Sequence, residues 1–476
     1  MIKNYDVSTT FFDEMFTTKE SPHTHYQPLY ENISKLDKKV VESRYQLAQQ
    51  NFLRQGITFT VYNNTEGTER TMPFDPLPRI ISKEEWAFVE KGLQQRVLAL
   101  NAFLEDIYTE QNILNEGVIP RDLVVTSPHF YHQVYGIKVP AKNHIFLAGI
   151  DLIRDHEGNY LVLEDNIRNP SGLSYVFQNR FVMRKLFPDL FNNYSIESLE
   201  NQLHEMHAAL KYITPNKKEN PTIVLLTPGV YNSAYYDHSF LAKEMGIELV
   251  EARDLVVNNQ VVYMKTTKGL KKVDVIYRRI DDDFLDPLVF REDSLIGVPG
   301  LIDAYRAGNV SIANGVGNGV ADDKATYAYV PDMIRFYLNE DPILKNVETY
   351  QLSKQEDYEY ALNNLDQLVF KERNSSGGYN MLIGPQATED EKRLYRQKIK
   401  ENPSAFIAQP TISLSQSPTF TDEGIQGRHV DLRAFVVLNE IPHVVPGGLT
   451  RVALQKGSLV VNSSQGGGGK DTWILD

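Results

Sequence analysis

The most informative segment of this 476-residue chain is GIDLIRDHEGNYLVLEDNIRNPSG, which runs from Gly149 to Gly172. Two apolar runs flank the turn-forming residues His156, Glu157 and Gly158. Apolar runs of strand length on either side of a short polar turn predict an antiparallel hairpin, here over residues 145–167. Acidic and amide side chains stand at the ends of its strands, so the hairpin is also the first place to look for chemistry.

Asp151, Glu164 and Asn166 form the first candidate site. Glu164 and Asn166 are two residues apart and share a strand face, and antiparallel pairing brings Asp151 to the same end of the hairpin. Three hard oxygen donors on one face suit Mg²⁺, which prefers oxygen ligands and often binds together with phosphate. The alternative is a polar strand end without a metal, in which Asn166 caps a turn.

Lys371 marks a second candidate site, at the end of the apolar run LVFK. The loop after it contains Ser375, Ser376, Gly377 and Gly378. Successive backbone N–H groups of such a loop can surround an anion, and the lysine adds a positive charge, so the arrangement suits phosphate. The Gly-Lys-Ser/Thr order of a Walker A motif is absent. An ordinary glycine-rich hairpin is the alternative.

Two arginines near the C-terminus form a third candidate. Arg433 lies in the strand-like run RHVDLRAFVVL and Arg451 in HVVPGGLTRVAL, which we expect to be a single strand. Arginines on neighbouring strands can bind phosphate or carboxylate in a bidentate manner. The polar and glycine residues that accompany them are Asn462, Gly466 and Gly467. Taken singly, each arginine can equally be a solvated charge on a sheet face.

Composition excludes several kinds of chemistry. Lys and Arg number 49 against 62 Asp and Glu, a net charge of −13, and no cysteine is present. The charge disfavours nucleic acid and anionic membranes as partners. The lack of cysteine excludes disulfides, thiolate catalysis and cysteine-ligated metals. We find no signal peptide and no apolar run long enough for a membrane helix, so we expect a cytoplasmic protein.

The rest of the chain predicts alternating helices and strands. Residues 1–55 are expected to be mainly helical, and the capping box Ser82-x-x-Glu85 opens a helix that runs to about Glu110. TIVLLTPG, a helix and the strand IELVEARDLVV predict a parallel α/β unit. A long helix over Asp323–Leu338 and several strands follow. The predicted class is therefore α/β (α+β).

These pieces together resemble the ATP-grasp superfamily of carboxylate–amine ligases. Glu164 follows Asp151 by 13 residues and Asn166 follows it by 15, the spacing of the metal triad in D-alanine–D-alanine ligases. VADDKATYAYVPDMI resembles the segment of the first ATP lysine and assigns that role to Lys324. LVFKERNSSGGYNMLIG resembles the second-lysine strand and its lid, which gives Lys371.

Two further blocks extend the resemblance. FIAQP resembles the strand that receives adenine, around Gln409, and DLRAFVV…GGLTRVAL…VNSSQGGGG resembles the Arg…Arg…Asn path of glutamate-ligating enzymes. The lysine strand departs from the pattern, because Glu372-Arg373 stands where a proline is expected, and Asn380 replaces a frequent glycine.

In this chain the metal hairpin precedes the lysines, which is a circular permutation. Roughly residues 11–475 resemble the circularly permuted ATP-grasp (type 2) family, related to glutathionylspermidine synthases. The resemblance implies an N-terminal mainly helical region and a pre-ATP-grasp α/β domain. The four implied parts are residues 1–140 (helical), 141–215 (metal hairpin and helices), 216–320 (pre-ATP-grasp) and 321–476 (lysines, lid and phosphate-binding residues).

The resemblance implies an ATP-dependent ligase that joins a carboxylate substrate to an amine acceptor through an acyl phosphate. Its cofactors would be ATP and one or two Mg²⁺. An ATP-binding regulatory or scaffold protein without turnover is the alternative. The family also implies companion proteins of the α-E and transglutaminase-like types.

Substrate contacts are expected at two other places. The run Asp281–Asp283 follows Arg278 and Arg279 and would favour a cationic amine, although a solvated loop is the alternative. A set that follows the hairpin would contact the carboxylate substrate: Arg168, Tyr175 and Arg180.

Overall fold

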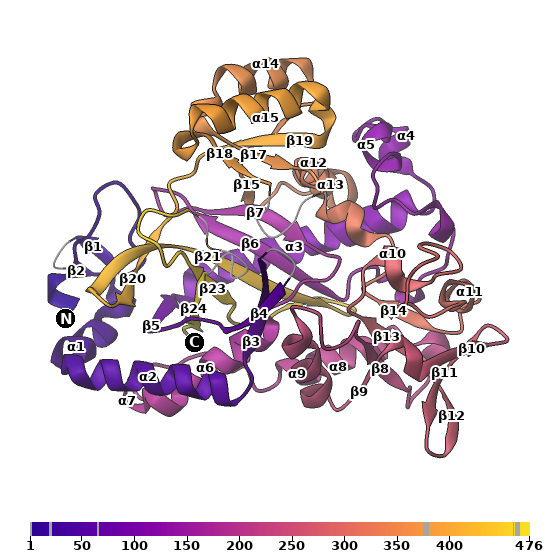
Figure 1. The fold of residues 1–476 in the computed structure, drawn as a ribbon, viewed down its shortest axis with the longest axis horizontal. Helices are drawn as coiled ribbons and strands as arrows, with labels where there is room; N and C mark the ends of the chain where they lie inside the picture. Colours follow the sequence, from indigo (N-terminus) through magenta and orange to yellow (C-terminus); the bar gives the residue numbers. More distant parts are fainter. Residues whose placement is uncertain (1, 19–20, 64–65, 375–379, 460, 462–466) are drawn as a thin grey trace.

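The computed structural model describes residues 2–18, 21–63, 66–374, 380–459, 461 and 467–476. Its centre is a nine-stranded sheet that contains the hairpin (Figure 1). Seven strands follow in the order β15-β7-β6-β21-β23-β24-β5, and β20 and β22 pair with β21 beside them. Their bounds are β5 Phe74–Ile81, β6 Leu147–Arg154, β7 Tyr160–Asn166, β15 Lys345–Asn346, β20 Gln416–Thr421, β21 Gly424–Leu438, β22 Pro442–Val444, β23 Leu449–Val452 and β24 Gly468–Ile474.

The predicted hairpin is confirmed, and it lies against strands from the far end of the chain. β6 pairs antiparallel with β7 on one side and with β21 on the other, and Asp151 lies directly opposite Arg433. β24 pairs in parallel with β5, so the N-terminal region also contributes to this sheet. The circular permutation is thus visible as one sheet in which strands from residues 74–166 lie beside strands from residues 416–474, with β15 at one edge.

Both faces of this sheet are buried, because side chains alternate between two helical layers. Leu432, Ala434 and Val436 of β21 lie in the core that contains helix α3 (Lys83–Ile107). Phe435 and Val437 point the other way, into the core that contains α6 (Leu173–Leu186) and α8 (Gln202–Tyr212). The part of β21 from Ala434 to Leu438 is apolar on both sides for this reason.

The predicted α/β unit is present as a parallel sheet of order β14-β13-β8-β9. Its strands are β8 Ile223–Leu226, β9 Glu248–Val250, β13 Val275–Arg278 and β14 Ser311–Ala313, and helix α9 (Tyr235–Met245) joins the first two. The expectation of one strand over IELVEARDLVV is wrong. A capping box between Glu251 and Asp254 turns the chain after β9, and β10 (Leu255–Asn258) then pairs with β11 (Val261–Thr266) in a separate sheet with β12 (Gly269–Lys272).

A smaller antiparallel sheet carries the second lysine. Its order is β16-β19-β17-β18, with bounds Tyr350–Gln351, Phe406–Pro410, Leu368–Glu372 and Leu382–Ile383. Helices α14 (Gln355–Asn363) and α15 (Glu389–Glu401) cover it at the top of Figure 1. Lys371 stands near the end of β17, as the sequence predicts.

Three other predictions of secondary structure need correction. The long helix expected over Asp323–Leu338 is two helices, α12 (Lys324–Tyr327) and α13 (Val330–Leu338), because Pro331 lacks the N–H that a continuous helix requires. Pro446-Gly447-Gly448 likewise separates β22 from β23 in the run expected as one strand. Within residues 1–55, α1 (Gln27–Lys35) and α2 (Lys38–Arg54) leave the first 26 residues mostly irregular.

The remaining described elements are short: β1 Phe16–Thr18, β2 Ser21–Pro22, β3 Thr58–Asn63, β4 Glu66–Thr71, α4 Asn112–Asn115, α5 Arg121–Val125, α7 Pro188–Phe191, α10 Asp282–Leu285 and α11 Leu301–Arg306. Within the described part of the chain, no helix is both long and apolar enough to span a bilayer.

We predict that Leu100→Ala destabilises the protein by about 2–5 kcal/mol, because the side chain is fully buried on the core face of α3 and its loss leaves a cavity. Leu98→Ala on the exposed face of the same helix is the matched control and should change stability by less than about 0.5 kcal/mol. Urea unfolding followed by circular dichroism measures both. Equal losses in the two variants would contradict this packing.

Candidate functional site

A bulge in the hairpin sets the orientation of the candidate metal ligands. Asp151 pairs with Glu164, but its neighbour Leu152 pairs with Val162, so Leu163 is an extra residue in β7. The extra residue brings Glu164 to the same face as Asp151. The next residue, Asp165, points to the opposite face, where its carboxylate accepts two bonds of 2.6 Å from Arg96 of α3.

Asp151 is the centre of a buried ion-pair network. Arg433 donates from Nε to Oδ1 (2.6 Å) and from Nη2 to Oδ2 (2.9 Å), and Arg451 donates to Oδ2 (2.8 Å). Arg451 also pairs with Asp431, its cross-strand neighbour, at 2.9 Å through Nε. Burial opposes the charge of Asp151, but the two guanidinium groups outweigh it and lower its pKa to about 2.

Glu164 and the first predicted lysine form the next pair. Lys324 Nζ lies 3.0 Å from Glu164 Oε1, and each side chain is only partly exposed. Burial opposes ionisation of Glu164, but Lys324 outweighs it and lowers the pKa of the carboxyl, and Lys371 acts in the same direction. The structure therefore brings the metal-triad carboxylate and both predicted lysines within one electrostatic environment.

Lys371 reaches this environment from the smaller sheet. Its Nζ donates to Gln409 Oε1 at 2.7 Å, and Gln409 Nε2 donates to Thr349 at 2.9 Å. Burial lowers the pKa of Lys371 to about 8, with Lys324 adding to the effect and Glu164 opposing it. Gln409, predicted beside adenine, thus lies next to the second lysine because β19 and β17 are paired strands.

The start of α12 is held against the lysine strand. Asp323 caps the helix by accepting from Ala325 N at 2.8 Å, and its carboxylate also pairs with Arg373 at 2.7 Å. Arg373 belongs to the first of the two departures from the family pattern, Glu372-Arg373, and its ion pair with Asp323 joins the lysine strand to α12. The other departure, Asn380, has a φ of 55°, a left-handed conformation that asparagine tolerates better than most residues.

A cavity opens beside these pairs. Its lining contains two candidate metal ligands, Glu164 and Asn166, and the first predicted lysine, Lys324. The other lining residues are His129, Arg168, Asp322, Asp323, Arg373 and Asn374. His129 and Asp322 were not singled out from the sequence, and no spacing signal points to them. They join the site only through tertiary contact, since Asp322 accepts from the backbone N–H groups of Ile167 and Arg168 just after β7.

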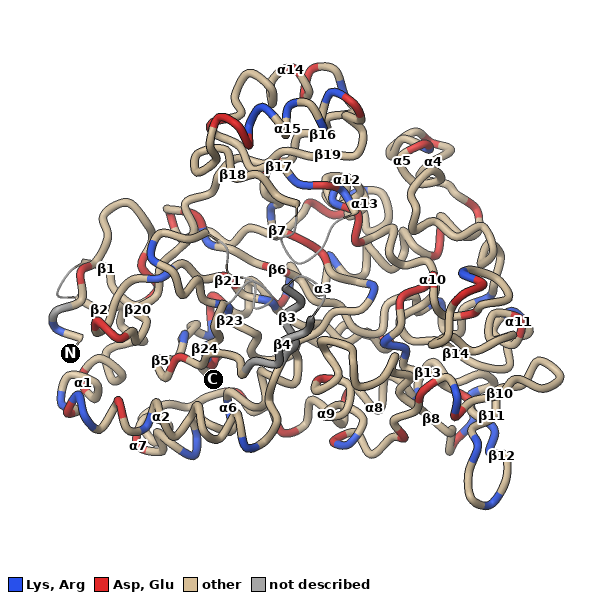
Figure 2. Tube along the Cα trace, in the orientation of Figure 1, with Lys and Arg blue, Asp and Glu red and all other residues tan. Residues whose placement is uncertain are grey.

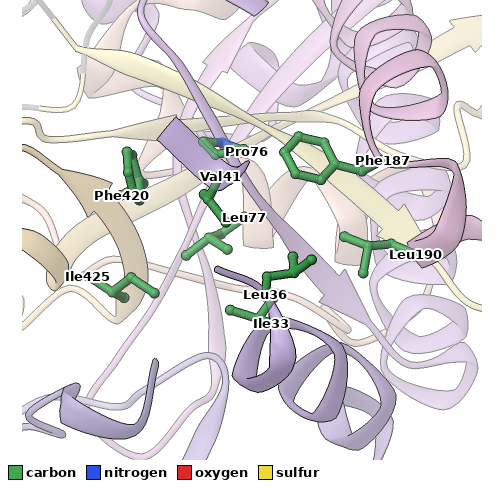
Figure 3. Close-up of a pocket in the computed structure, with 9 residues that line it drawn as sticks. All are labelled: Ile33, Leu36, Val41, Pro76, Leu77, Phe187, Leu190, Phe420 and Ile425. Carbon is green, nitrogen blue, oxygen red and sulfur yellow. The ribbon is translucent and has the colours of Figure 1, made fainter. Parts of the chain in front are cut away.

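A second cavity is lined only by apolar residues from α1, α2, β5, α7 and their neighbours, including Ile33, Leu77, Phe187 and Phe420 (Figure 3). It offers no titratable group, so we do not assign chemistry to it. Acidic and basic residues are interspersed along the chain, and both kinds occur around β6, β7 and β21 (Figure 2).

Several sequence-predicted residues do not join this site or cannot be placed. Arg180 is committed to Asp471 at 3.0 Å, and Tyr175 donates to the Thr58 carbonyl at 3.0 Å, so neither lines the cavity. Gly467 immediately precedes β24. Six predicted contacts lie outside the described residues: Ser375, Ser376, Gly377, Gly378, Asn462 and Gly466.

The residues present fit Mg²⁺ in their chemistry. Asp151, Glu164 and Asn166 can offer oxygen ligands, and the buried side-chain nitrogen of Asn166 has no hydrogen-bond partner within the part of the chain that the structure describes. Among the described residues no cluster of three His, Asp or Glu side chains is placed to hold a metal. A magnesium site here would therefore depend on the amide and on nucleotide oxygens.

A central sheet that bears a carboxylate hairpin, together with a small lysine-bearing sheet, defines an ATP-grasp protein. The chain belongs to the family described as circularly permuted ATP-grasp type 2, whose model matches residues 78–453. A solved glutathione synthetase-like effector from Globodera pallida is similar with a TM-score of 0.58 at 11% identity, over 93% of this chain and 98% of that one. This likeness shows a shared fold.

Relatives share the sequence closely. An uncharacterized protein of Synechocystis sp. is 49% identical over 100% of this chain and 98% of its own length. One from Mycobacterium tuberculosis is 49% identical over 99% of this chain and 85% of its length. A Frankia alni protein, whose name proposes a glutamate–cysteine ligase, is 40% identical over 97% of this chain but only 54% of its own length.

We predict that Asp151→Asn destabilises the protein by about 3–5 kcal/mol at pH 7, because two buried guanidinium groups lose their counter-charge. A folded pKa of about 2 lies below the unfolded value of about 4, so this stabilisation is complete above pH 4 and disappears as the pH falls toward 2. Urea midpoints of wild type and variant should therefore converge at low pH.

The matched control is Asp293→Asn, which breaks an exposed aspartate–arginine pair with Arg291 at 2.8 Å. Its midpoint should stay close to that of wild type at every pH. A difference between wild type and Asp151→Asn that does not change with pH would contradict the network described here.

Proposed function

We propose that the protein is an ATP-dependent carboxylate–amine ligase that forms an amide through an acyl phosphate. One observation carries the proposal: Lys324, at the start of helix α12, and Lys371, in strand β17, share one electrostatic environment with the carboxylates Asp151 and Glu164. Phosphoryl transfer needs this combination of cations and metal-binding oxygens, because its transition state carries charge on several oxygens at once.

The chemistry starts from the poor reactivity of a carboxylate, whose leaving group would be oxide. Transfer of the γ-phosphoryl group supplies a good leaving group. Lys324 and Lys371 are suited to hold ATP phosphates, and Arg433 and Arg451 to hold the γ-phosphate or the acyl phosphate. Mg²⁺, bound by Asp151, Glu164 and Asn166, would neutralise charge on the β- and γ-phosphates.

The proposed phosphate-binding side chains already have partners within the protein, and these contacts would have to change when a nucleotide binds. Each of the four proposed phosphate-binding cations has a carboxylate or amide partner. Lys324 bonds Glu164 and Lys371 bonds Gln409, while Arg433 and Arg451 both bond Asp151. When ATP binds, Lys324, Lys371, Arg433 and Arg451 would bond phosphate oxygens in place of their present partners, and the carboxylates of Asp151 and Glu164 would become available to hold Mg²⁺. Such an exchange keeps the region close to electrically balanced both before and after binding.

The Frankia name suggests glutamate as a first carboxylate to test, but this chain aligns with only about half of that protein. From the family resemblance we also propose that the protein has companion proteins of the α-E and transglutaminase-like types. The second candidate function is ATP binding without ligation, as a regulatory or scaffold protein.

We predict that Glu164→Gln lowers amine-dependent ADP release by about 100-fold or more, because the substitution removes a charged ligand beside Lys324. The assay supplies ATP, Mg²⁺, a panel of carboxylates (glutamate, glutathione, γ-glutamyl peptides) and a panel of amines. The matched control is Glu157→Gln in the exposed turn of the same hairpin, which should leave the rate unchanged. ATP binding without turnover in any combination would favour the regulatory function.

Lys371 should make nucleotide binding depend on pH. Its pKa of about 8 in the free protein means that the positive charge is lost as the pH rises through 8, so affinity for ATP should fall over that range. Titration calorimetry at several pH values measures this. Lys371→Met should bind ATP more weakly at pH 7 and show little further decline above pH 8. An unchanged profile in the variant would show that Lys371 does not contact phosphate.

A further inference from the structure

The cavity beside Glu164 extends away from the lysines toward a second group of polar residues. His129 and Arg168 lie side by side there. Both side chains pack against Gly319, where an added Cβ atom would lie 3.2 Å from each of them. Arg168 Nε lies 3.6 Å from Asp281 and 3.7 Å from Asp322, too far for hydrogen bonds. The cavity therefore joins the phosphate-transfer region to an acidic region formed by other elements.

The charges of this region leave an acidic excess. Three carboxylates are matched by close cations, in the pairs Asp323–Arg373 (2.7 Å), Glu164–Lys324 (3.0 Å) and Asp282–Arg278 (3.1 Å). The carboxylates that remain are Asp281, Asp283 and Asp322, and the cation among them is the loosely paired Arg168. An excess of two negative charges favours a cationic ligand over an anionic one.

A buried carboxylate next to the cavity adds to the negative charge of this region. Asp282 is 1% exposed, and one of its oxygens accepts from Gly317 N at 2.9 Å, while the other has no hydrogen-bond partner among the described residues. Asp282 lies close enough to His129, Arg168 and Tyr131 to affect the ionisation of all three. Asp282 does not line the cavity, so its carboxylate contributes negative charge around His129 and Arg168 and makes no contact with the cavity itself.

His129 is the one imidazole in the lining of this cavity. Its ring makes no hydrogen bond to any described residue, whereas its backbone N–H donates to Ser127 Oγ at 3.3 Å. Burial lowers the pKa of His129, and Arg168 adds to the effect, while Asp282, Asp323 and Asp283 oppose it. Tyr108, which directly follows α3, donates its hydroxyl to the His129 carbonyl and makes no hydrogen bond to the ring. At neutral pH the ring is therefore a free base.

We propose that this cavity is the acceptor site of the ligase, that it binds an alkylamine in its cationic form, and that His129 takes the proton from it. The proposal rests on the ligase function argued above. Asp281, Asp283 and Asp322 attract the ammonium ion, and the cavity places it beside Glu164 and Asn166, where the acyl phosphate would form.

The step balances in atoms and charge. An ammonium ion has no lone pair, so it must lose a proton before it can attack a carbonyl carbon. His129 accepts that proton, the nitrogen lone pair forms the C–N bond, and the C–O bond to phosphate breaks. Inorganic phosphate leaves with the electron pair of that bond, and the second proton of the amine goes to phosphate or water. Asp282 and Asp283 would stabilise the imidazolium ion that results.

The test compares two acceptors that differ in whether they need a base. Hydroxylamine is largely unprotonated at neutral pH and attacks an acyl phosphate without help, whereas primary alkylamines are ammonium ions. We expect His129→Asn to lower the rate with alkylamines by about 100-fold while hydroxamate formation stays within a few-fold of wild type. His132→Asn, an exposed histidine of the same loop, is the matched control and should change neither rate.

Two further readouts separate a proton acceptor from a structural residue. With wild type, the alkylamine rate should fall on acidification through the His129 pKa, and this step should be missing in His129→Asn. Asp281→Asn should raise KM for alkylamines several-fold and leave KM for hydroxylamine unchanged, because only the former carries charge.

Three outcomes would overturn the proposal. Equal losses with both acceptors in His129→Asn would show a structural role. Wild-type turnover with hydroxylamine but with no alkylamine would show that the acceptor is not a cation. If neither hydroxamate nor amide forms from any carboxylate, the proposed ligase function is wrong, and the acceptor site with it. The first two outcomes, in contrast, contradict only the acceptor site.

Discussion

The arrangement of this protein depends on one buried carboxylate, Asp151, and the two arginines that bond it. Arg433 and Arg451 are 282 and 300 residues away in sequence, yet both donate to the same side chain. An uncompensated charge at this depth would be costly, so the three strands that carry these residues must come together. The contact thereby joins the early hairpin to the C-terminal strands and makes a permuted chain order compatible with one continuous sheet.

The same contact explains how a site rich in charge can exist before nucleotide binds. Asp151 and Asp431 balance Arg433 and Arg451, and Glu164 balances Lys324. Groups that would otherwise repel one another are therefore held near the positions from which they could bind phosphate and metal. Preorganisation of this kind reduces the rearrangement that ligand binding requires. Asp281 and Asp322 flank Arg168 beside the same cavity, and in the proposal above they favour a cation there.

Much of this could be predicted from local sequence. Two apolar runs and the turn at His156–Gly158 predict the hairpin, and the capping box at Ser82 predicts the start of α3, because both signals act over a few residues. Predictions failed where a single residue interrupts a longer pattern. Pro331 divides one expected helix, and the capping box at Glu251 ends one expected strand early. The bulge at Leu163 was missed since an extra residue in a strand leaves no mark in the alternation of a short apolar run.

The sequence alone determined the family, the order of the metal hairpin and the lysines, and the residue types available for chemistry, because these are properties of motifs and their spacing. Only the tertiary structure decided which groups meet. It places His129 and Asp322 in the cavity, commits Arg180 to Asp471, and gives Arg373 a partner in Asp323. Such contacts join residues far apart in the chain, and their geometry follows from how two layers of helices bury both faces of one sheet, which no local pattern encodes.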